Sequence, residues 1–349
     1  MNVLVTGAPG WLGTRFVKAL CGEIDDLKEL SLINQIDEIR CLVLDNIPTD
    51  SLDRIHSKVK IHRGDLTNIN SLDGFFENCK GGTLFHLAGI VHPLKRTQEF
   101  YKVNLEGSKN ILNLAIKNRL KRIIAVSSNS PAGTNSTNDD LFTEDRPYNP
   151  YMNYGISKMK METEINKSYK NGNLETVIIR PCWFYGPDQP PRQTLFFSMI
   201  KNGSVPIVGS GENKRSMSYI DNTCSALLLA YSSEKANGQT YWIADKKPYS
   251  MNEIVDTIEK LLEEEFKFKV AHKRLRLPNI IGETAYWFDL ILQSSGIYHQ
   301  KIHVLSEMNK TIACSVVKAQ KDLGYSPKIS LEEGMRRSLK WCIDSGMII

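Results

Sequence analysis

The sequence predicts an α/β protein built on a doubly wound parallel sheet, with a smaller α/β region after it. Up to about residue 180, short β-branched runs alternate with stretches of helical periodicity. This alternation is typical of parallel strands with helices on both faces of the sheet. A glycine-rich turn directly after the first apolar run strengthens the prediction, and so does a change of composition near Pro181.

Composition places the chain among ordinary globular proteins. It has 349 residues, of which 41% are hydrophobic and 24% charged, enough for one large domain or two closely joined domains. The net charge is +5, but the lysines and arginines are scattered among acids, which argues against a nucleic-acid partner. The seven cysteines include no close pair with metal-ligand spacing, so reduced thiols, no metal site and a cytoplasmic location are expected.

The chain shows no targeting or membrane-spanning pattern. A strand pattern begins at the first residues, which leaves no room for a signal peptide. The segment Ile280 to Ile297 comes nearest to a membrane span, yet Glu283, Asp289 and Gln293 interrupt it. We therefore expect a surface or core helix there and no membrane partner.

Six strands are expected in the first part of the chain. They are Asn2–Val5, Ile39–Leu44, Val59–His62, Thr83–His86, Ile123–Ser127 and Thr176–Ile179. Helical periodicity follows the first strand over Trp11–Leu20 and recurs over Leu105–Ile116. The stretch between Glu23 and Glu38 is interpreted as an acidic surface insertion.

Pro181 and the run from Gly186 to Pro191 break this alternation and mark the crossing to a second region. The chain is expected to return to the first domain for Tyr219 to Trp242 and then to leave it for good. Helices are expected over Asn252–Glu265 and Leu331–Cys342 in the second region. The predicted boundaries are residues 1–182 and 216–248 for the first domain, and residues 183–215 and 249–349 for the second.

Gly7, Gly10 and Gly13 follow the first strand and open the helix that begins at Trp11. Without side chains, these positions allow a phosphate to approach the backbone, and the amides and dipole of the helix start stabilise its charge. A purely structural glycine turn is the alternative. The strand before and the helix after favour a Rossmann-type site for a dinucleotide.

Asp45 follows the second strand, where a carboxylate can accept hydrogen bonds from the adenosine ribose. It lies farther from Gly13 than the roughly 20 residues usual for this fingerprint. A carboxylate there repels a 2′-phosphate, so NAD is favoured over NADP, although Arg54 can soften this preference. A solvated turn aspartate is the alternative interpretation.

Two further strand ends are expected to line the cofactor. Asp65 closes the third strand, where it can accept a hydrogen bond from the adenine amino group. The small residues Ala88 and Gly89 close the fourth and let the backbone lie against the cofactor. His86 is interpreted as a packed strand histidine rather than a catalyst.

Tyr154 and Lys158 are four residues apart on an expected helix, which puts them on one face with Cβ atoms about 5–6 Å apart. A neighbouring ammonium and a positive nicotinamide ring both favour the phenolate, so a lowered tyrosine pKa is expected. Ser128 can hydrogen-bond the same substrate oxygen, and Asn104 can order a water or backbone group near Lys158. An exposed Tyr and Lys pair on a helix surface is the alternative.

On these residues the chain resembles the extended short-chain dehydrogenase/reductase family, in its NAD-dependent epimerase/dehydratase group. The motifs that carry the resemblance are the glycine loop, Asp45, Asp65, His86-Leu87-Ala88, Asn104, Ser127-Ser128, Tyr154 with Lys158, Arg180-Pro181 and Tyr185-Gly186-Pro187. The resemblance implies that Ser128, Tyr154 and Lys158 are catalytic and that Asn104 supports them. The expected NAD-contacting residues are Gly7, Gly10, Trp11, Leu12, Gly13, Asp45, Asn46, Asp65, Leu66, Leu87, Ala88, Gly89, Tyr154, Lys158 and Pro181.

The resemblance also implies a nucleotide sugar as substrate, because members of the family usually bind one in the C-terminal domain. Arg215 is the first candidate for a diphosphate contact, since a guanidinium can donate two hydrogen bonds to phosphate oxygens. Arg192 is the second, and Ser128 and Asn129 complete the expected substrate contacts. Either arginine can instead be an ordinary surface residue.

The expected activity is NAD-dependent epimerisation, with proton transfer by Tyr154 and hydride transfer to nicotinamide C4. Dehydration is not expected, because Asn129 and Ser130 stand where 4,6-dehydratases carry an Asp-Glu pair. The alternatives are an NAD(P)-dependent dehydrogenase or reductase of an alcohol or ketone, such as a sterol, and a non-catalytic dinucleotide-binding regulator. A homodimer is expected by analogy, with Met152, Met159 and Met161 as an apolar seam or simply as core.

Overall fold

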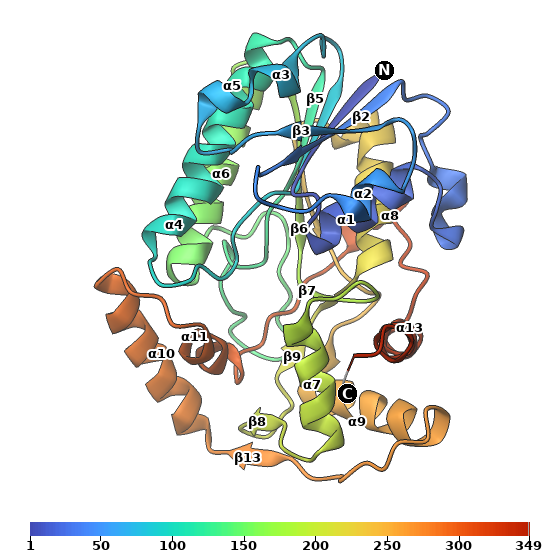
Figure 1. Cartoon of the computed structure of the whole chain (residues 1–349). Helices are drawn as coiled ribbons and strands as arrows, with labels where there is room; N and C mark the ends of the chain where they lie inside the picture. The colour runs from blue at the N-terminus through green and yellow to red at the C-terminus, as the bar shows by residue number, and fades with distance from the viewer. Residues whose placement is uncertain (348) are drawn as a thin grey trace.

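The computed structural model describes residues 1–347 and 349. Its centre is a seven-stranded parallel sheet in the order β11-β6-β5-β4-β1-β2-β3 (Figure 1). The strands are β1 (Asn2–Thr6), β2 (Glu38–Val43), β3 (Val59–Arg63), β4 (Thr83–His86), β5 (Arg122–Val126), β6 (Glu175–Pro181) and β11 (Gln239–Ile243). The order reverses at β1, which pairs with β2 on one side and β4 on the other. This reversal opens the crevice where doubly wound sheets bind their ligands.

Helices cover both faces of this sheet. They are α1 (Trp11–Leu20), α2 (Asp50–Asp53), α3 (Asp73–Phe76), α4 (Gln98–Phe100), α5 (Ser108–Lys117), α6 (Met152–Lys170), α8 (Ile220–Ser232) and α12 (Val317–Leu323). Short 3-10 helices cover Asp25–Leu30, Ile69–Ser71 and Glu234–Ala236, and π-helical turns cover Tyr101–Gly107 and Leu261–Glu265.

Alternate residues of each strand pack into different cores, as the period of two requires. Val3 and Val5 face the core that contains α1 and α8, whereas Leu4 faces the core that contains α5. Figure 1 shows α5 and α6 on one side of the sheet and α1 and α8 on the other. Because both faces are covered, the inner strands β1, β4, β5 and β6 are buried almost throughout, and their carboxyl ends are left to form the site.

The second region lies against the carboxyl ends of the strands and has its own apolar core (Figure 1). Its helices are α7 (Pro191–Lys201), α9 (Met251–Lys260), α10 (Asn279–Ser294), α11 (Gln300–Glu307) and α13 (Leu331–Asp344). Its short strands are β7 (Trp183–Tyr185), β8 (Pro206–Val208), β9 (Lys214–Arg215), β10 (Met217–Tyr219), β12 (Tyr249–Ser250) and β13 (Leu275–Leu277). The core side chains come mainly from α7, α9 and α13, while α10 and α11 form a separate hairpin beside them.

The predicted doubly wound sheet is confirmed, and each predicted strand lies within two residues of its observed bounds. One placement differs from the prediction that the chain leaves the first domain after residue 248. Ile312, Cys314, Val316 and Ala319 pack in the core of the first domain. The Tyr325 hydroxyl donates a hydrogen bond of 2.8 Å to the carbonyl oxygen of Ala244.

The stretch between Glu23 and Glu38 also differs from a plain surface insertion, because Leu27, Leu32 and Ile36 are buried in the first core. Within residues 1–347 and 349, no helix combines the length and the apolar character that crossing a membrane requires.

Candidate active site

The glycine turn between β1 and α1 is shaped by contacts that admit no side chain. Gly7 has a φ of +93°, and a Cβ atom there would lie 2.7 Å from the backbone nitrogen of Ala88. A Cβ atom on Gly13 would lie 2.3 Å from the carbonyl oxygen of Gly7. Gly10 is the N-cap residue of α1, and no side chain caps this helix start. The turn therefore presents bare backbone beside the amino end of a ten-residue helix.

Trp11 and Leu12 serve the fold as well as the turn. The indole nitrogen of Trp11 donates a hydrogen bond of 2.6 Å to the carbonyl oxygen of Pro187, in the loop that crosses to the second region. Leu12 is partly buried against the main core. The hydrogen bond of Trp11 joins the glycine turn directly to the loop that leads into the second region.

Three acidic or amide side chains predicted for the adenosine end lie at the carboxyl ends of neighbouring strands. Asp45 and Asn46 follow β2 and are exposed. Asp65 follows β3, and its Oδ1 accepts a hydrogen bond of 2.8 Å from the backbone nitrogen of Thr67. Leu66 is buried and packs beside Gly107.

His86 is a packed strand histidine, as predicted. Its Nδ1 lies 2.8 Å from the Thr6 hydroxyl and its Nε2 lies 2.8 Å from the Ser108 hydroxyl. Burial lowers its pKa to about 3, so the ring is neutral. It fixes the end of β4, from which Leu87 and Ala88 continue past the glycine turn.

Asn104 joins this strand end to the helix that carries Tyr154. Its side chain is fully buried, accepts a hydrogen bond of 2.8 Å from the Ile90 nitrogen and donates one of 3.0 Å to the Ile90 oxygen. It also donates to the Ser157 hydroxyl at 3.1 Å. A Cβ atom on Gly89 would lie 3.0 Å from the Lys158 Nζ and 3.2 Å from the Asn104 Oδ1, so glycine keeps this approach open.

Tyr154 and Lys158 both lie on the buried side of α6 and are 8% and 3% exposed. The Lys158 ammonium donates a hydrogen bond of 3.0 Å to the Val126 carbonyl oxygen, at the end of β5. Ser128 follows the same strand and is 8% exposed. The alternative of an exposed helix-surface pair is therefore excluded.

The pKa of Tyr154 departs from its usual value in the direction opposite to the prediction. Burial raises it to about 12, although a hydrogen bond with Ser128 works to lower it. Burial also lowers the pKa of Lys158 to about 8, while the charge of Glu162 opposes this effect. In this structure the phenol accordingly holds its proton, and the ammonium is easier to deprotonate than an exposed lysine.

The turn after β5 supplies hydroxyl and amide groups. The Ser128 Oγ lies 3.5 Å from the Asn129 Oδ1 and 3.4 Å from the Ser130 Oγ. Pro181 ends β6 and is buried next to this turn's strand. None of the side chains at 128–130 is a carboxylate.

The two predicted substrate arginines lie in the second region and differ in their surroundings. Burial lowers the pKa of Arg192, while the electrostatic effects of Tyr298 and Tyr154 act to raise it. Arg215 is half-buried on β9 and donates from Nη2 to the Glu307 carbonyl oxygen. Its Nε is buried without a hydrogen-bond partner among the described residues.

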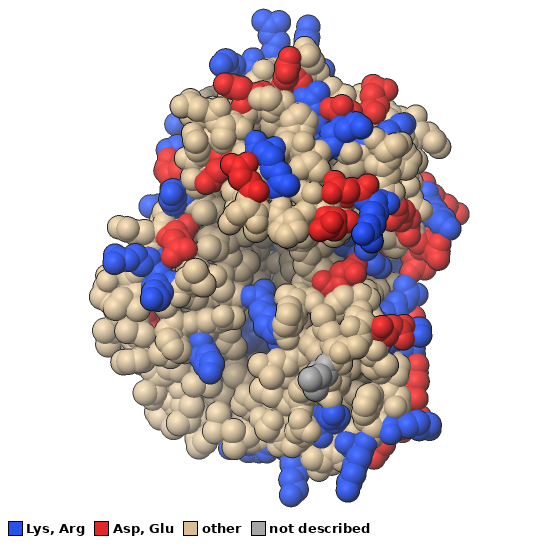
Figure 2. Space-filling model, viewed as in Figure 1, with Lys and Arg blue, Asp and Glu red and all other residues tan. Residues whose placement is uncertain are grey.

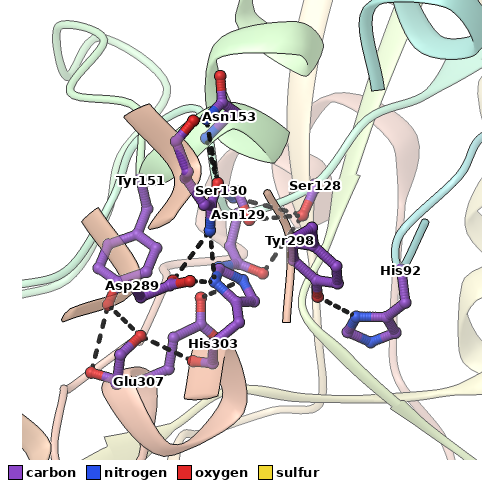
Figure 3. Close-up of polar contacts among 12 residues, drawn as sticks. His92, Ser128, Asn129, Ser130, Tyr151, Asn153, Asp289, Tyr298, His303 and Glu307 are labelled. Carbon is purple, nitrogen blue, oxygen red and sulfur yellow. Dashed lines mark hydrogen bonds and ion pairs between the residues drawn. The ribbon is translucent and has the colours of Figure 1, made fainter. Parts of the chain in front are cut away.

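Sequence reasoning missed the contribution of the α10–α11 hairpin to this site (Figure 3). The Tyr298 hydroxyl lies 2.6 Å from the His92 Nδ1, and its ring packs with Phe100 and Tyr154. His92 and Tyr298 are more than 200 residues apart, so no local motif links them.

A buried polar group holds this hairpin on the first turn of α6. The His303 Nδ1 donates to the Asp289 Oδ2 at 2.8 Å, and the Gln293 Nε2 donates to the same oxygen at 2.9 Å. The Gln293 Oε1 accepts from the Asn153 nitrogen at 3.1 Å, one residue before Tyr154 (Figure 3). Burial works to lower the pKa of His303, but the Asp289 hydrogen bond and nearby carboxylates outweigh it, so the pKa is raised.

The face of the molecule seen in Figure 2 is hollowed between the parallel sheet and α7, with basic side chains at the lower rim. Together, the glycine turn, the Ser128–Tyr154–Lys158 group and the α10–α11 hairpin form a site between the two regions. Of the expected dimer methionines, Met152 and Met161 are buried within the chain, and only Met159 is partly exposed.

The family model described as "NAD dependent epimerase/dehydratase family" matches residues 3–244. The "Uncharacterized protein y4nL" of Sinorhizobium fredii is 46% identical over 345 residues, which cover 99% of this chain and 96% of that protein. The N-acetyl-alpha-D-glucosaminyl-diphospho-ditrans,octacis-undecaprenol 4-epimerase of Escherichia coli O157:H7 is 26% identical, with coverage of 97% and 95%. The crystal structure of UDP-glucuronic acid 4-epimerase from Bacillus cereus in complex with NAD is 22% identical, covers 99% of both chains and has a TM-score of 0.75.

Proposed function

Because the chain belongs to the NAD-dependent epimerase/dehydratase family, we propose that it is an NAD-dependent epimerase acting on a nucleotide sugar. The observation that carries the proposal is the buried Ser128–Tyr154–Lys158 group at the carboxyl end of β5. It lies beside Gly89 and the glycine turn, where a dinucleotide would bring its reactive ring.

The residues present fit NAD as the cofactor. Gly7, Gly10 and Gly13 form a tight turn in which any Cβ atom would collide with backbone of the chain, and the amino end of α1 begins at this turn. Asp45 would accept from the adenosine ribose hydroxyls and disfavour a 2′-phosphate. When bound, NAD supplies reversible two-electron oxidation of a carbon that bears a hydroxyl.

The protein's own groups would handle the proton at the reacting oxygen. Tyr154 holds its proton in this structure, so it must first lose that proton. As a phenolate it would accept the proton of the substrate hydroxyl when the hydroxyl becomes a ketone, and it would return this proton when the ketone is reduced. Ser128 would donate a hydrogen bond to the same oxygen. The Lys158 ammonium would favour the phenolate once the site is closed to water, because charges interact more strongly in a dry environment.

The same site disfavours dehydration. A 4,6-dehydratase reaction needs one group to deliver a proton to the leaving hydroxyl and another to remove a carbon-bound proton. Asn129 and Ser130 offer an amide and a buried hydroxyl, neither of which is acidic or basic enough near neutral pH. Beyond the reversible oxidation that NAD would supply, epimerisation needs a group that carries the hydroxyl proton, which Tyr154 would provide, and rotation of the ketone.

Arg192 and Arg215 are the proposed diphosphate contacts. Among the described residues, the buried Nε of Arg215 has no hydrogen-bond partner, and Arg192 lies in the first turn of α7 with its pKa lowered by burial. Similarity to the E. coli epimerase extends the substrate class to sugars linked through a diphosphate to a lipid, since the same arginines would bind that diphosphate.

The first experiment is a panel of nucleotide sugars incubated with the enzyme and NAD, analysed by chromatography and by absorbance at 340 nm. We expect an epimerised product without net absorbance change. Lasting formation of NADH would instead identify the dehydrogenase alternative.

Tyr154→Phe is expected to lower turnover by about 10³-fold with little change in melting temperature, because it removes only the proton-carrying hydroxyl. Tyr169→Phe is the matched control, since Tyr169 is an exposed phenol farther along the same helix. Full turnover by Tyr154→Phe would contradict the proposed chemistry and favour a non-catalytic role.

A further inference from the structure

Helix α10 carries an apolar stripe that faces solvent. Ile280, Trp287 and Ile291 are 65%, 61% and 63% exposed, and Phe288 is 52% exposed. These positions recur at helical spacing and share one side of the helix. The opposite side is the one that packs inward through Ala285, Asp289 and Gln293. A core helix would bury such a stripe, and contiguous exposed apolar surfaces of this kind mark interaction sites.

The stripe continues beyond the end of the helix. Leu94 is 91% exposed and Ile297 is 50% exposed. Their segments lie side by side, since Arg96 and Ile297 form an antiparallel bridge and the Tyr298 nitrogen donates to the Lys95 oxygen at 2.8 Å. We name this surface the α10 patch; its members are Leu94, Ile280, Trp287, Phe288, Ile291 and Ile297.

Basic groups predominate around the α10 patch; the Glu99 carboxylate, which accepts a hydrogen bond of 3.4 Å from the Arg96 backbone nitrogen, is the acidic group at this rim. Lys95, Arg96 and Lys301 are exposed beside it, and within the described residues none of the three forms an ion pair. The acids on α10 are engaged elsewhere: Glu283 pairs with Lys310 and Asp289 with His303. In Figure 2 the surface over α10 is mostly uncharged, with basic groups along its upper edge and little acidic surface.

We propose that the α10 patch binds the surface of an anionic phospholipid membrane, with α10 lying in the plane of the interface. Apolar side chains on one side of such a helix enter the boundary between headgroups and acyl chains, and tryptophan is favoured at that depth. Lysine and arginine at the rim attract anionic headgroups. This mode needs no spanning segment, because the helix lies on the membrane and does not cross it.

A second copy of the chain is the competing occupant, and the charges disfavour it. A twofold contact places the same patch on both partners. Lys95, Arg96 and Lys301 would then face their own copies across a small apolar contact, with no free acid on α10 to balance them. A membrane surface of negative charge meets the same rim with complementary sign.

The α10 patch lies directly beside the candidate active site. Ile297 at its edge directly precedes Tyr298, whose ring packs 5.4 Å from Phe100 in the cluster that contains Tyr154. Binding through the α10 patch would therefore hold the site mouth close to the lipid surface. The surface itself is inferred from exposure and charge, and it stands independently of the reaction proposed above.

The test is co-sedimentation of the full chain with large unilamellar vesicles. Vesicles of phosphatidylcholine and phosphatidylglycerol in equal amounts are compared with vesicles of phosphatidylcholine alone. We expect binding that prefers the anionic vesicles and weakens at high salt, because screening reduces the attraction of the basic rim. The Trp287→Glu/Ile291→Glu variant is expected to lose affinity by about tenfold or more.

Val317→Glu is the matched control, because Val317 is 64% exposed on α12, away from the patch, and its replacement should leave binding unchanged. Ile280→Glu/Phe288→Glu provides a second variant of the patch, and circular dichroism melting confirms that each variant is folded. Lys95→Glu/Arg96→Glu is expected to remove the preference for anionic vesicles.

Absence of wild-type binding to anionic vesicles would overturn the proposal, as would equal loss in Val317→Glu. Sedimentation velocity decides the remaining case. If the wild type is a dimer that Trp287→Glu/Ile291→Glu converts to a monomer, the patch is a subunit interface and the membrane proposal is wrong.

Discussion

Lys158 is an ammonium group held almost entirely out of water, with the Val126 carbonyl as its hydrogen-bond acceptor. Burial lowers its pKa from 10.5 to about 8, so the folded state binds this proton less tightly than the unfolded chain. Stability rises with pH wherever the unfolded state holds more protons. Between about pH 8 and pH 10.5, Lys158 therefore becomes less destabilising as pH rises.

The lowered pKa of Lys158 predicts how the stability of the protein without NAD changes with pH. The unfolding free energy of the wild type should gain up to about 3 kcal/mol over that of Lys158→Met between pH 7.5 and pH 10.5. Urea unfolding of both proteins at each pH measures the difference and cancels the other titrating groups. A constant difference across this range would contradict a lowered pKa at Lys158.

Site residues that are brought together by their spacing along one helix could be predicted from the sequence. Tyr154 and Lys158 are four apart on a helix, and this spacing alone puts them on one face. The direction of the Tyr154 pKa could not be read, because burial depends on the α10–α11 hairpin that covers it. His303 and Asp289 were missed since they are 14 residues apart across a turn and match no periodic pattern.

At the scale of elements, the β1–α1 turn is fixed by backbone contacts at its glycines. Gly13→Ala would force a Cβ atom to 2.3 Å from the Gly7 oxygen, so the turn must open. We expect a loss of about 2–4 kcal/mol in stability together with loss of NAD affinity.

Gly74→Ala is the control, because nothing lies within 4 Å of its Cβ position. Thermal melting and NAD titration calorimetry measure both effects, and an unchanged Gly13→Ala protein would refute the packing argument.

The α10–α11 hairpin depends on a histidine–carboxylate pair whose strength varies with pH. The raised His303 pKa stabilises the fold fully below the unfolded value of 6.5, and this contribution is lost as pH rises through the folded pKa. Asp289→Asn should cost about 1–3 kcal/mol at pH 5.5 and less at pH 8. Hydrogen exchange of residues 279–307 reports the change locally.

Glu283→Gln is the matched control on the same hairpin, because its half-exposed pair with Lys310 contributes about 0–1 kcal/mol. Equal protection of the hairpin in Asp289→Asn and wild type at pH 5.5 would show that the pair does not hold it in place.

Whole elements of the sheet were predictable because β-branched runs between helices have few alternative arrangements. The return of residues 312–325 to the first core was not. Ile312, Cys314 and Val316 are apolar enough for either core, and composition does not record which one they enter. Element order alone therefore fixed the sheet but left the course of the last hundred residues open.

At the scale of the molecule, the two regions are joined by more than the covalent chain. Arg15 on α1 donates to Asp188, in the crossing loop, at 3.2 Å, while Asp221 on α8 of the same first region accepts from its guanidinium at 2.6 and 2.9 Å. Trp11 contacts the same loop through Pro187. These links favour one cooperative unfolding unit over two independent ones.

We predict a single unfolding transition in calorimetry that NAD shifts upward as a whole. At a concentration 100 times its dissociation constant, NAD adds about 2.7 kcal/mol of stability. ADP-ribose, which lacks the reactive ring, serves as a comparison for the adenosine half. Two transitions, of which only one responds to NAD, would show that the regions unfold separately.

The return of the 312–325 segment also decides how this polypeptide can be divided. A protein truncated after residue 310 would lack α12, which packs beside β11 and α8. It would also lack the apolar side chains that this segment adds to the first core, so the exposed core would make it prone to aggregate. A minimal fragment of the first region must instead include that late stretch, so the second region is an interruption within one folded unit and not an appendage at its end.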